Sequence, residues 1–149
     1  MSFVLFIFIP MIAALFIPIL YKKLNGIHTG WFALLVPVFL FAVYTTFLPE
    51  VIQGNTFISS LPWIPTLDIS FISYIDGLSL LFSLLITGIG SLVVLYSIFY
   101  LDKTREQLHN FYVYLMLFMT AMLGIVQSDH LISLYFFWEL TSISSFLLI

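Results

Sequence analysis

The sequence predicts an all-α integral membrane protein with about five transmembrane helices, an outside N-terminus and a short β-hairpin-like loop on the extracytoplasmic side. Of its 149 residues, 62% are hydrophobic and only 7% are charged, whereas a typical soluble domain carries about 25% charged residues. Five apolar runs have the length of a helix, and the few basic residues gather in two of the connections. Because so few charges cannot cover a soluble surface, the chain requires a bilayer.

The five apolar runs are each close to the roughly 20 residues that a helix needs to cross a bilayer. Prolines inside the first two runs indicate kinks, which neighbouring helices tolerate in a membrane. The first run has no positive region before it and no clear cleavage site after it, so we expect a retained helix rather than a signal peptide. We expect a single membrane domain over 1–149, which we expect to be incomplete because it stops inside an apolar run, with helices at about 3–20, 30–48, 77–101, 108–126 and 131–149.

The distribution of charge predicts the orientation. Cytoplasmic connections of membrane proteins carry an excess of Lys and Arg. All four basic residues of this chain lie between the first and second runs or between the third and fourth: Lys22, Lys23, Lys103 and Arg105. The remaining connections contain only acidic charges: Glu50, Asp68, Asp76 and Asp129. We therefore expect the N-terminus outside and the basic connections in the cytoplasm.

The long outer loop, 49–76, has a pattern of its own. Leu67, Ile69 and Phe71 alternate with polar residues, which is typical of a half-buried strand. The stretch Gln53-Gly54-Asn55 indicates a turn. We expect a short hairpin that lies on the outer face and covers helix ends or contacts another protein of a complex.

Two acidic residues lie where helix caps are expected, because a carboxylate accepts hydrogen bonds from the free amides of a helix start. Asp76 precedes the run at 77–101 and Asp129 precedes the run at 131–149. Along 77–101, small residues recur at helical spacing, which favours close helix packing and leaves a polar conduit as the alternative: Ser79, Ser83, Thr87, Gly90, Ser91 and Val94.

Glu139 is the strongest candidate for chemistry. It is the ninth residue of the run at 131–149, about 12 Å from its start and so near the middle of a bilayer core of about 30 Å. A charged carboxylate there costs at least about 2.5–3.5 kcal/mol, so it must face protein or water and be protonated or paired. Two interpretations stay open, a hydrogen bond between buried helices and a carboxylate that handles protons or ions, and we favour the second.

Other polar residues near Glu139 are weaker candidates. Thr141, Ser142 and Ser145 can hydrogen-bond to neighbouring helices or to their own backbone. His130, nine residues before Glu139 at the outer mouth, is a candidate for proton entry. The three histidines are scattered and cysteine is absent, so we predict no metal site. A net charge of −3 without a basic patch gives no support for nucleic-acid binding.

Two stretches resemble a known family. "YIDGLSLLFSLLITGIGSLVVLYSIFYL", from Tyr74 to Leu101, and "FYVYLMLFMTAMLGIVQSDHLISLYFFWELTSISSFLLI", from Phe111 to Ile149, resemble the N-terminal region of the antiporter-like subunits. These subunits occur in respiratory complex I and in Mrp-type multisubunit cation/proton antiporters. The stretch "WELTSISSFLLI" is more similar to the A subunit of the Mrp-type antiporters than to the complex I subunit.

The resemblance implies the N-terminal part of a larger antiporter-like bundle, with fourteen or more helices in the full subunit. It implies that Glu139 is the glutamate that pairs with a lysine on a later helix, which this sequence does not contain. It further implies a transporter rather than an enzyme, without a cofactor. Its partners would be other membrane subunits, H⁺, Na⁺ and the lipid of the bacterial plasma membrane, across which Na⁺ is exchanged for H⁺.

Two other functions remain open. One is a proton-pumping antiporter-like subunit of complex I or of a membrane hydrogenase. The other is a membrane scaffold fragment that transports nothing, in which case Glu139 would tolerate replacement by Gln or Leu with only an assembly defect.

Overall fold

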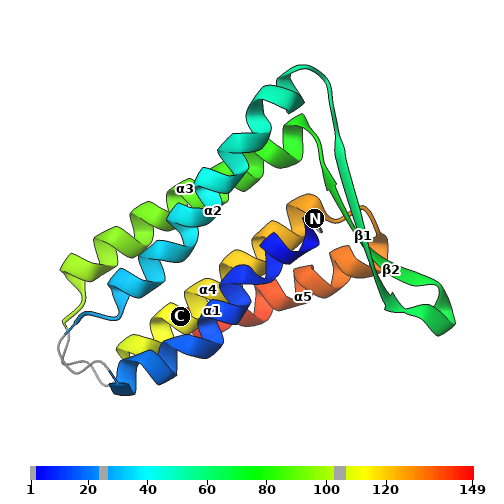
Figure 1. Cartoon of the computed structure of the whole chain (residues 1–149). Helices are drawn as coiled ribbons and strands as arrows, with labels where there is room; N and C mark the ends of the chain where they lie inside the picture. The colour runs from blue at the N-terminus through cyan, green and yellow to red at the C-terminus, as the bar shows by residue number, and fades with distance from the viewer. Residues whose placement is uncertain (1–2, 24–26, 103–106) are drawn as a thin grey trace.

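A computed structural model of the chain describes residues 3–23, 27–102 and 107–149. These residues form five α-helices and one two-stranded antiparallel sheet (Figure 1). All five helices are long and apolar enough to cross a membrane. The helices and strands are α1 (Val4–Lys23), α2 (Gly30–Ile52), β1 (Phe57–Ile64), β2 (Ile69–Ile75), α3 (Gly77–Tyr100), α4 (Leu108–Gln127) and α5 (Leu131–Leu148).

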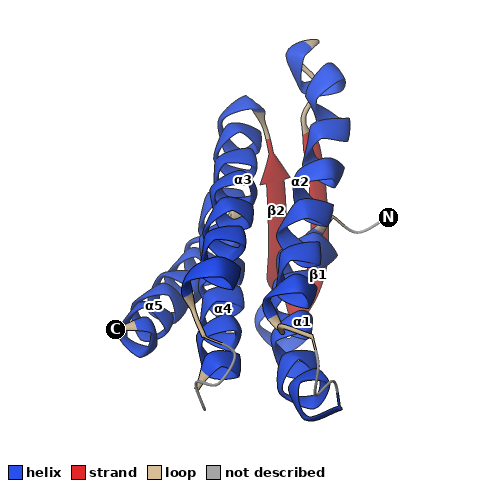
Figure 2. Cartoon of the chain, turned by 90° about the vertical axis from the view of Figure 1, so that its left-hand side faces the viewer, coloured by secondary structure: helices blue, strands red, loops and turns tan. Residues whose placement is uncertain are grey.

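The first four helices form a bundle. α2 packs along α3, α1 packs along α4, and α5 lies against α4. The helices thus form two groups, α2 with α3 and α1 with α4 and α5. Figure 1 shows the two groups close together at the end of the α1–α2 and α3–α4 connections and spread apart at the opposite end. The β1–β2 hairpin crosses this wide end, which we call the hairpin end. In the view of Figure 2 the hairpin is seen behind the helices, through the space between α2 and α3, with α5 at the edge of the molecule.

The buried core has two parts. At the hairpin end, α1, α2, α3, α4, β2 and α5 contribute to one cluster, which includes Ile7, Leu40, Phe71, Leu123 and Phe137. At the other end, α1, α2, α3 and α4 form a second cluster around Tyr112 and Met116. α5 therefore joins the core only through the hairpin end.

Two glycines allow the closest approaches between elements. A Cβ on Gly124 of α4 would lie 2.3–2.5 Å from three ring atoms of Phe137 on α5, and a Cβ on Gly90 of α3 would lie 2.4 Å from Cε of Met119 on α4. A residue with a side chain at either position would force its neighbour to move. The small-residue run of α3 thus serves packing, as its spacing suggested: Ser79, Ser83, Thr87 and Val94 are all buried.

Some element boundaries differ from those expected from hydropathy. α1 continues to Lys23 and α2 continues through Pro49 to Ile52, because the apolar run marks the bilayer while backbone hydrogen bonding can continue beyond it. A proline near a helix end removes one hydrogen bond without ending the helix. Beyond α2, Gly54 has a φ of 90°, which is the left-handed conformation that glycine adopts easily.

The hairpin pairs Phe57 with Ile75 at its base and Ile64 with Ile69 at its tip. A short 3₁₀ turn, η1 (Pro65–Leu67), joins the strands, and Asp68 follows it in the left-handed region with a φ of 55°. β2 thus begins at Ile69, two residues after Leu67. Phe71, Ser73 and Ile75 face the core in alternation, as expected for a half-buried strand.

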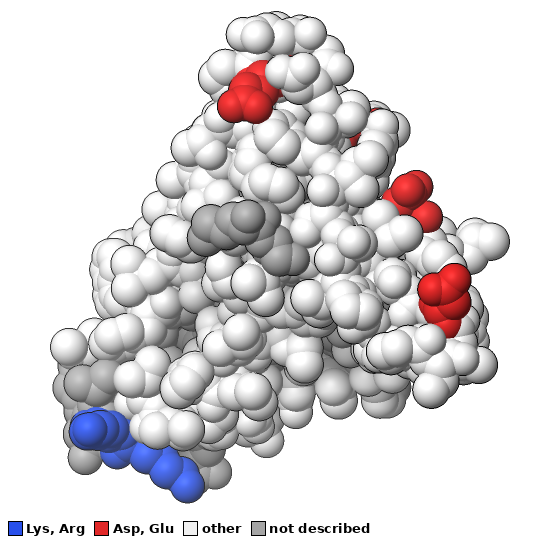
Figure 3. Space-filling view, turned by 45° about the vertical axis from the view of Figure 1, so that its right-hand side comes forward, with Lys and Arg blue, Asp and Glu red and all other residues white. Residues whose placement is uncertain are grey.

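The two ends of the molecule differ in charge. In Figure 3, the blue Lys atoms gather at one end of the surface and the red Asp and Glu atoms lie toward the other. Lys22 and Lys23 end α1, whereas Glu50, Asp68, Asp76 and Asp129 all lie at the hairpin end.

Candidate functional site

Glu139 lies halfway along α5, in a helix that extends from Leu131 to Leu148. At 1.5 Å per residue it is about 12 Å from the helix start. Its side chain is exposed in the described part of the chain. At this mid-helix position, the carboxylate is therefore not covered by any of the described residues.

The exposed position of Glu139 follows from helical geometry. Ser133, Phe137 and Ser144 are buried against α4, and at 100° per residue Phe137 lies on the side of the helix nearly opposite Glu139. The residues four positions before Glu139 and three, four and seven positions after it share its side of α5 and are exposed as well. We call this surface the free face of α5: Tyr135, Glu139, Ser142, Ile143 and Phe146. Phe136, three positions before Glu139, lies at the border of this side and contacts Trp63 of β1.

The hydroxyl groups near Glu139 are used within α5 itself. The Oγ1 of Thr141 donates to the carbonyl of Phe137 at 2.9 Å, and the Oγ of Ser142 donates to the carbonyl of Trp138 at 3.3 Å. Ser145 is exposed. These side chains therefore do not form a polar cluster around the carboxylate within the described residues.

The N-cap of α5 is His130, whose Nδ1 accepts a hydrogen bond from the backbone N–H of Ile132 at 3.3 Å. The expectation that Asp129 caps this helix is wrong: α5 begins at Leu131 as expected, but the N-cap is the residue directly before it, His130, and the backbone N–H of Asp129 donates instead to the carbonyl of Ile72 in β2 at 3.1 Å. His130 lies nine residues before Glu139, about 13 Å along the helix axis. The structure does not bring the two side chains together.

Asp76 is the N-cap of α3. Its Oδ1 accepts from the backbone N–H of Ser79 at 2.8 Å, and the Oγ of Ser79 accepts from the backbone N–H of Asp76 at 2.8 Å. The hydrogen bond from the Ser79 backbone is the main reason that the pKa of Asp76 is lowered from its ordinary value of 3.8. This carboxylate is occupied in holding a helix end.

A polar cluster at the hairpin end was not expected from the sequence. Nε2 of Gln127 donates to Oη of Tyr44 at 2.8 Å and to Oγ of Ser83 at 2.9 Å, while Oγ of Ser73 donates to Oε1 of Gln127 at 3.3 Å. All four side chains are buried. The last residue of α4 is thereby tied to α2, α3 and β2. The signal in the sequence was an amide at the end of an apolar run, since a polar group buried in a membrane needs partners.

A second polar cluster lies at the opposite end. Nδ1 of His28 accepts from the backbone N–H of Gly30 at 3.1 Å, so Nε2 carries the proton that is donated to the carbonyl of Leu101 at 3.2 Å. Oγ of Ser97 donates to Oη of Tyr112 at 3.0 Å. This cluster joins the start of α2 to the end of α3 and to α4.

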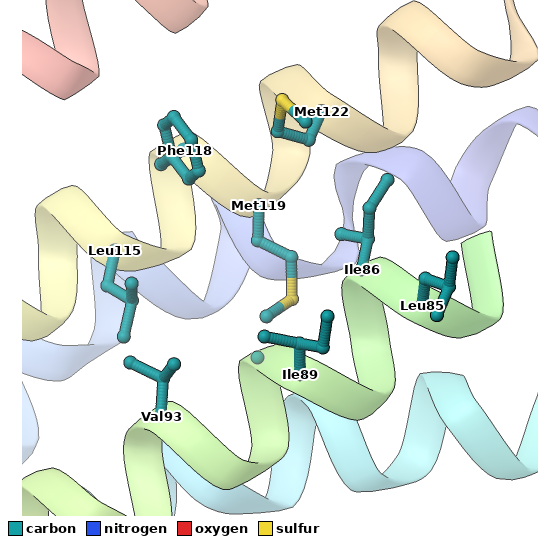
Figure 4. A pocket seen from close by; sticks show the side chains of 9 residues that line it. Leu85, Ile86, Ile89, Val93, Leu115, Phe118, Met119 and Met122 are labelled. Carbon is teal, nitrogen blue, oxygen red and sulfur yellow. The ribbon is translucent and has the colours of Figure 1, made fainter. Parts of the chain in front are cut away.

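An apolar groove of about 250 Å³ lies between α3 and α4. Figure 4 shows side chains of both helices pointing into it, among them Ile89, Val93, Phe118 and Met119. None of its lining residues carries a polar side chain, so the groove cannot hold an ion or transfer a proton. Within the described residues, no group of three or more His, Cys, Asp and Glu side chains could bind a metal.

Comparisons of the sequence with protein families and with known proteins agree with each other. The N-terminal family of chain 5 of NADH-ubiquinone oxidoreductase (complex I) matches residues 63–112. The A1 component of a Na⁺/H⁺ antiporter of Staphylococcus haemolyticus is 61% identical over 143 residues, which is 96% of this chain and 18% of the relative. The A component of a Na⁺/H⁺ antiporter of Alkalihalophilus pseudofirmus is 57% identical over 140 residues, 94% of this chain and 17% of the relative.

The fold is similar to part of a solved assembly, the Mrp complex of Dietzia sp. The TM-score is 0.78 at 25% sequence identity, over 96% of this chain and 15% of the other. The chain thus spans less than a fifth of the length of these proteins. The comparisons and the five apolar helices together indicate a multi-pass bacterial membrane protein.

Proposed function

Because this chain is similar over almost its whole length to the A-type components of Na⁺/H⁺ antiporters, we propose that it is part of a transporter that exchanges Na⁺ for H⁺ across the bacterial plasma membrane. In this proposal Glu139 is the carboxylate that takes part in proton transfer. Other membrane proteins complete the complex, as the relationship to the Mrp assembly suggests.

The observation that carries the proposal is the position of Glu139. It is the only charged residue of α5, it lies at mid-helix, and it points away from the helix on which α5 packs. A carboxylate at this depth is stable only when it is protonated, hydrated or paired. We propose that it faces a protein partner outside this chain, with a lysine as the opposite charge.

The proton transfer proposed for the Glu139–lysine pair follows from the low dielectric constant of the membrane interior. When the two charges are close, each stabilises the ionised form of the other. When they separate, an uncompensated charge remains in the membrane, and taking up or releasing a proton removes it. A proton can therefore be moved by the opening and closing of the pair, with no metal or organic cofactor in the step.

The test is the substitution Glu139→Gln in the full-length protein within its complex. Transport is measured as the Na⁺-dependent collapse of a pH gradient in everted membrane vesicles. We expect a loss of at least about a hundredfold, the lower range for removal of a proton-transferring group, at normal assembly. Glu139→Asp, which keeps the carboxylate, should retain part of the activity.

A matched control is Glu50→Gln, the same chemical change at an exposed position near the end of α2. It should leave transport unchanged. Normal transport by the assembled Glu139→Gln complex would contradict the proposal and favour a scaffold.

A second candidate function is a proton-pumping subunit of a redox-driven complex, which the match of residues 63–112 to the complex I family favours. The same vesicle assay separates the two functions. Antiport requires only Na⁺ and a pH gradient, whereas a redox-driven pump translocates protons only when an electron donor is supplied.

A further inference from the structure

The support of α5 is unusually one-sided. Among the described residues, α4 is the only helix that makes an extensive contact with α5. The buried side of α5 is a narrow line of residues, of which Phe137 is the largest. A helix held along one narrow line can rotate about that line unless a second element prevents it.

The β1–β2 hairpin is that second element. The backbone N–H of Asp129, in the turn between α4 and α5, donates to the carbonyl of Ile72 at 3.1 Å. In the same turn, Ser128 forms an antiparallel bridge with Ser73. Since Ser73 also donates to Gln127, β2 is bonded to the last residue of α4 and to the turn that leads into α5.

Aromatic contacts extend this connection onto α5. The ring of Phe71 in β2 meets the ring of Phe137 edge-on, with centroids 5.2 Å apart, and Phe8 of α1 lies against both rings. Trp63 of β1 meets Phe136 at 5.6 Å. On its other side, Phe137 is pressed against Gly124 of α4. Two adjacent residues of α5 are thus held by both hairpin strands.

We propose that the β1–β2 hairpin is a clamp that sets the rotation of α5 and so the direction of Glu139. Phe136 and Phe137 lie three and two residues before Glu139, less than one helical turn away. A rotation at the clamp is therefore transmitted directly to the carboxylate. The inference rests on the proposed function of Glu139, and it makes Phe71 and Trp63 positioning residues. A misplacement of about 1 Å of a reacting group can cost about a hundredfold in rate.

The first experiment locks the clamp in place. Ser73 and Ser128 are partners in an antiparallel bridge, whose Cα atoms are about 4.5–5.5 Å apart, within the range of a disulfide. The chain contains no cysteine, so Ser73→Cys with Ser128→Cys provides a single pair in this region. In the full complex we expect the disulfide to form on oxidation and transport to stay within about twofold of the reduced form.

The second experiment loosens the clamp and then locks it. We expect Phe71→Leu and Trp63→Ala each to lower Na⁺-dependent transport at least about fivefold at normal complex abundance, and Phe71→Tyr to retain activity because it keeps the ring. Adding the disulfide should restore transport to within about twofold of the parent, and a reducing agent should remove that rescue. Ile58→Ala is the matched control, because Ile58 lies on the same hairpin with 63% of its side chain exposed.

The third experiment reports the position of α5 without transport. A cysteine in place of Ile143, on the free face, is labelled with a maleimide in the assembled complex. We expect the labelling rate to change at least about threefold in Trp63→Ala and to return when the Ser73–Ser128 disulfide forms. This measurement remains informative even if Glu139→Gln transports normally, which would contradict the proposed function alone.

Three results would overturn the clamp: wild-type transport in assembled Trp63→Ala and Phe71→Leu, a disulfide that forms and gives no rescue, or an unchanged labelling rate at position 143. If Phe71→Leu fails to assemble, Trp63→Ala decides the matter, because Trp63 is 45% exposed and its loss leaves the core intact.

Discussion

At the residue scale, two polar side chains in apolar helices have opposite surroundings. Gln127 is buried with three hydrogen-bonding partners inside the chain, whereas Glu139 is exposed on the free face of α5. A satisfied polar group stabilises a fold, and an unsatisfied one at mid-membrane requires a partner. The difference identifies Gln127 as a structural residue, whereas Glu139 has no partner among the described residues, as the proposed ion pair with a lysine outside them requires.

Gln127 gives the prediction that belongs to this scale. Gln127→Leu removes the amide and leaves the hydroxyls of Tyr44, Ser83 and Ser73 without their shared partner, so we expect a loss of about 1–3 kcal/mol of stability. The measurement is the thermal inactivation midpoint of the purified full-length complex in detergent. Thr46→Val, on the exposed side of α2 where the hydroxyl donates only to Val43, should change the midpoint little. An unchanged midpoint in Gln127→Leu would show that the cluster contributes nothing.

The sequence alone drew attention to Glu139 as a candidate but not to Gln127. A carboxylate in the middle of an apolar run is conspicuous without any structure, because its cost is large. Gln127 lies at the end of its run, where an amide is common, and its importance depends on Tyr44, Ser83 and Ser73, which come from distant parts of the chain. The same limit explains Asp129, since its backbone pairs with β2 and such a pairing has no local signature.

At the scale of elements, the start of α3 was predictable because all of its determinants are local. Asp76 and Ser79 are three residues apart and exchange hydrogen bonds in a capping box. The end of α2 was not predictable in the same way, because hydropathy reports the bilayer rather than the last backbone hydrogen bond. The hairpin was predicted from the alternation of apolar and polar residues in the outer loop. Its contacts with α5 were not predictable, because they depend on the tertiary arrangement of the helices.

The capping box gives a prediction of pH dependence. The pKa of Asp76 is lowered in the folded protein, so its charged form adds stability above its ordinary pKa, and that contribution is lost as the pH falls through the lowered pKa. Asp76→Asn keeps the cap but carries no charge. We expect the wild type to exceed Asp76→Asn in thermal stability near neutral pH, and the difference to begin to shrink below about pH 4, the ordinary pKa of Asp, and to vanish once the pH is below the lowered pKa.

The capping contribution itself is tested by Asp76→Ala, which removes the acceptor at every pH. We expect a loss of about 0.5–2 kcal/mol, read as a lower thermal midpoint of the full-length complex across the whole pH range. A difference between wild type and Asp76→Asn that grows at low pH would contradict the assigned direction of the pKa shift.

At the scale of the whole molecule, the two ends differ both in charge and in the distance between the two helix groups. The described basic residues, Lys22 and Lys23, lie at the end where the helix groups meet, whereas Glu50, Asp68, Asp76 and Asp129 lie at the hairpin end (Figure 3). The clamp on α5 therefore lies on the side that the charge rule assigns to the exterior. Conditions outside the cell would act directly on the element that orients Glu139.

This orientation gives the last prediction. Leu67→Cys, at the exposed hairpin tip, and Lys22→Cys, at the end of α1, are introduced one at a time into a full complex from which all other cysteines have been removed, so that each position is labelled separately. In intact cells producing the full complex, a membrane-impermeant maleimide should label position 67 at once and position 22 only after the membrane is permeabilised. The physical reason is that Lys and Arg next to a helix are retained on the cytoplasmic side. Labelling in the reverse order would invert the topology and place the clamp, together with the start of α5, in the cytoplasm.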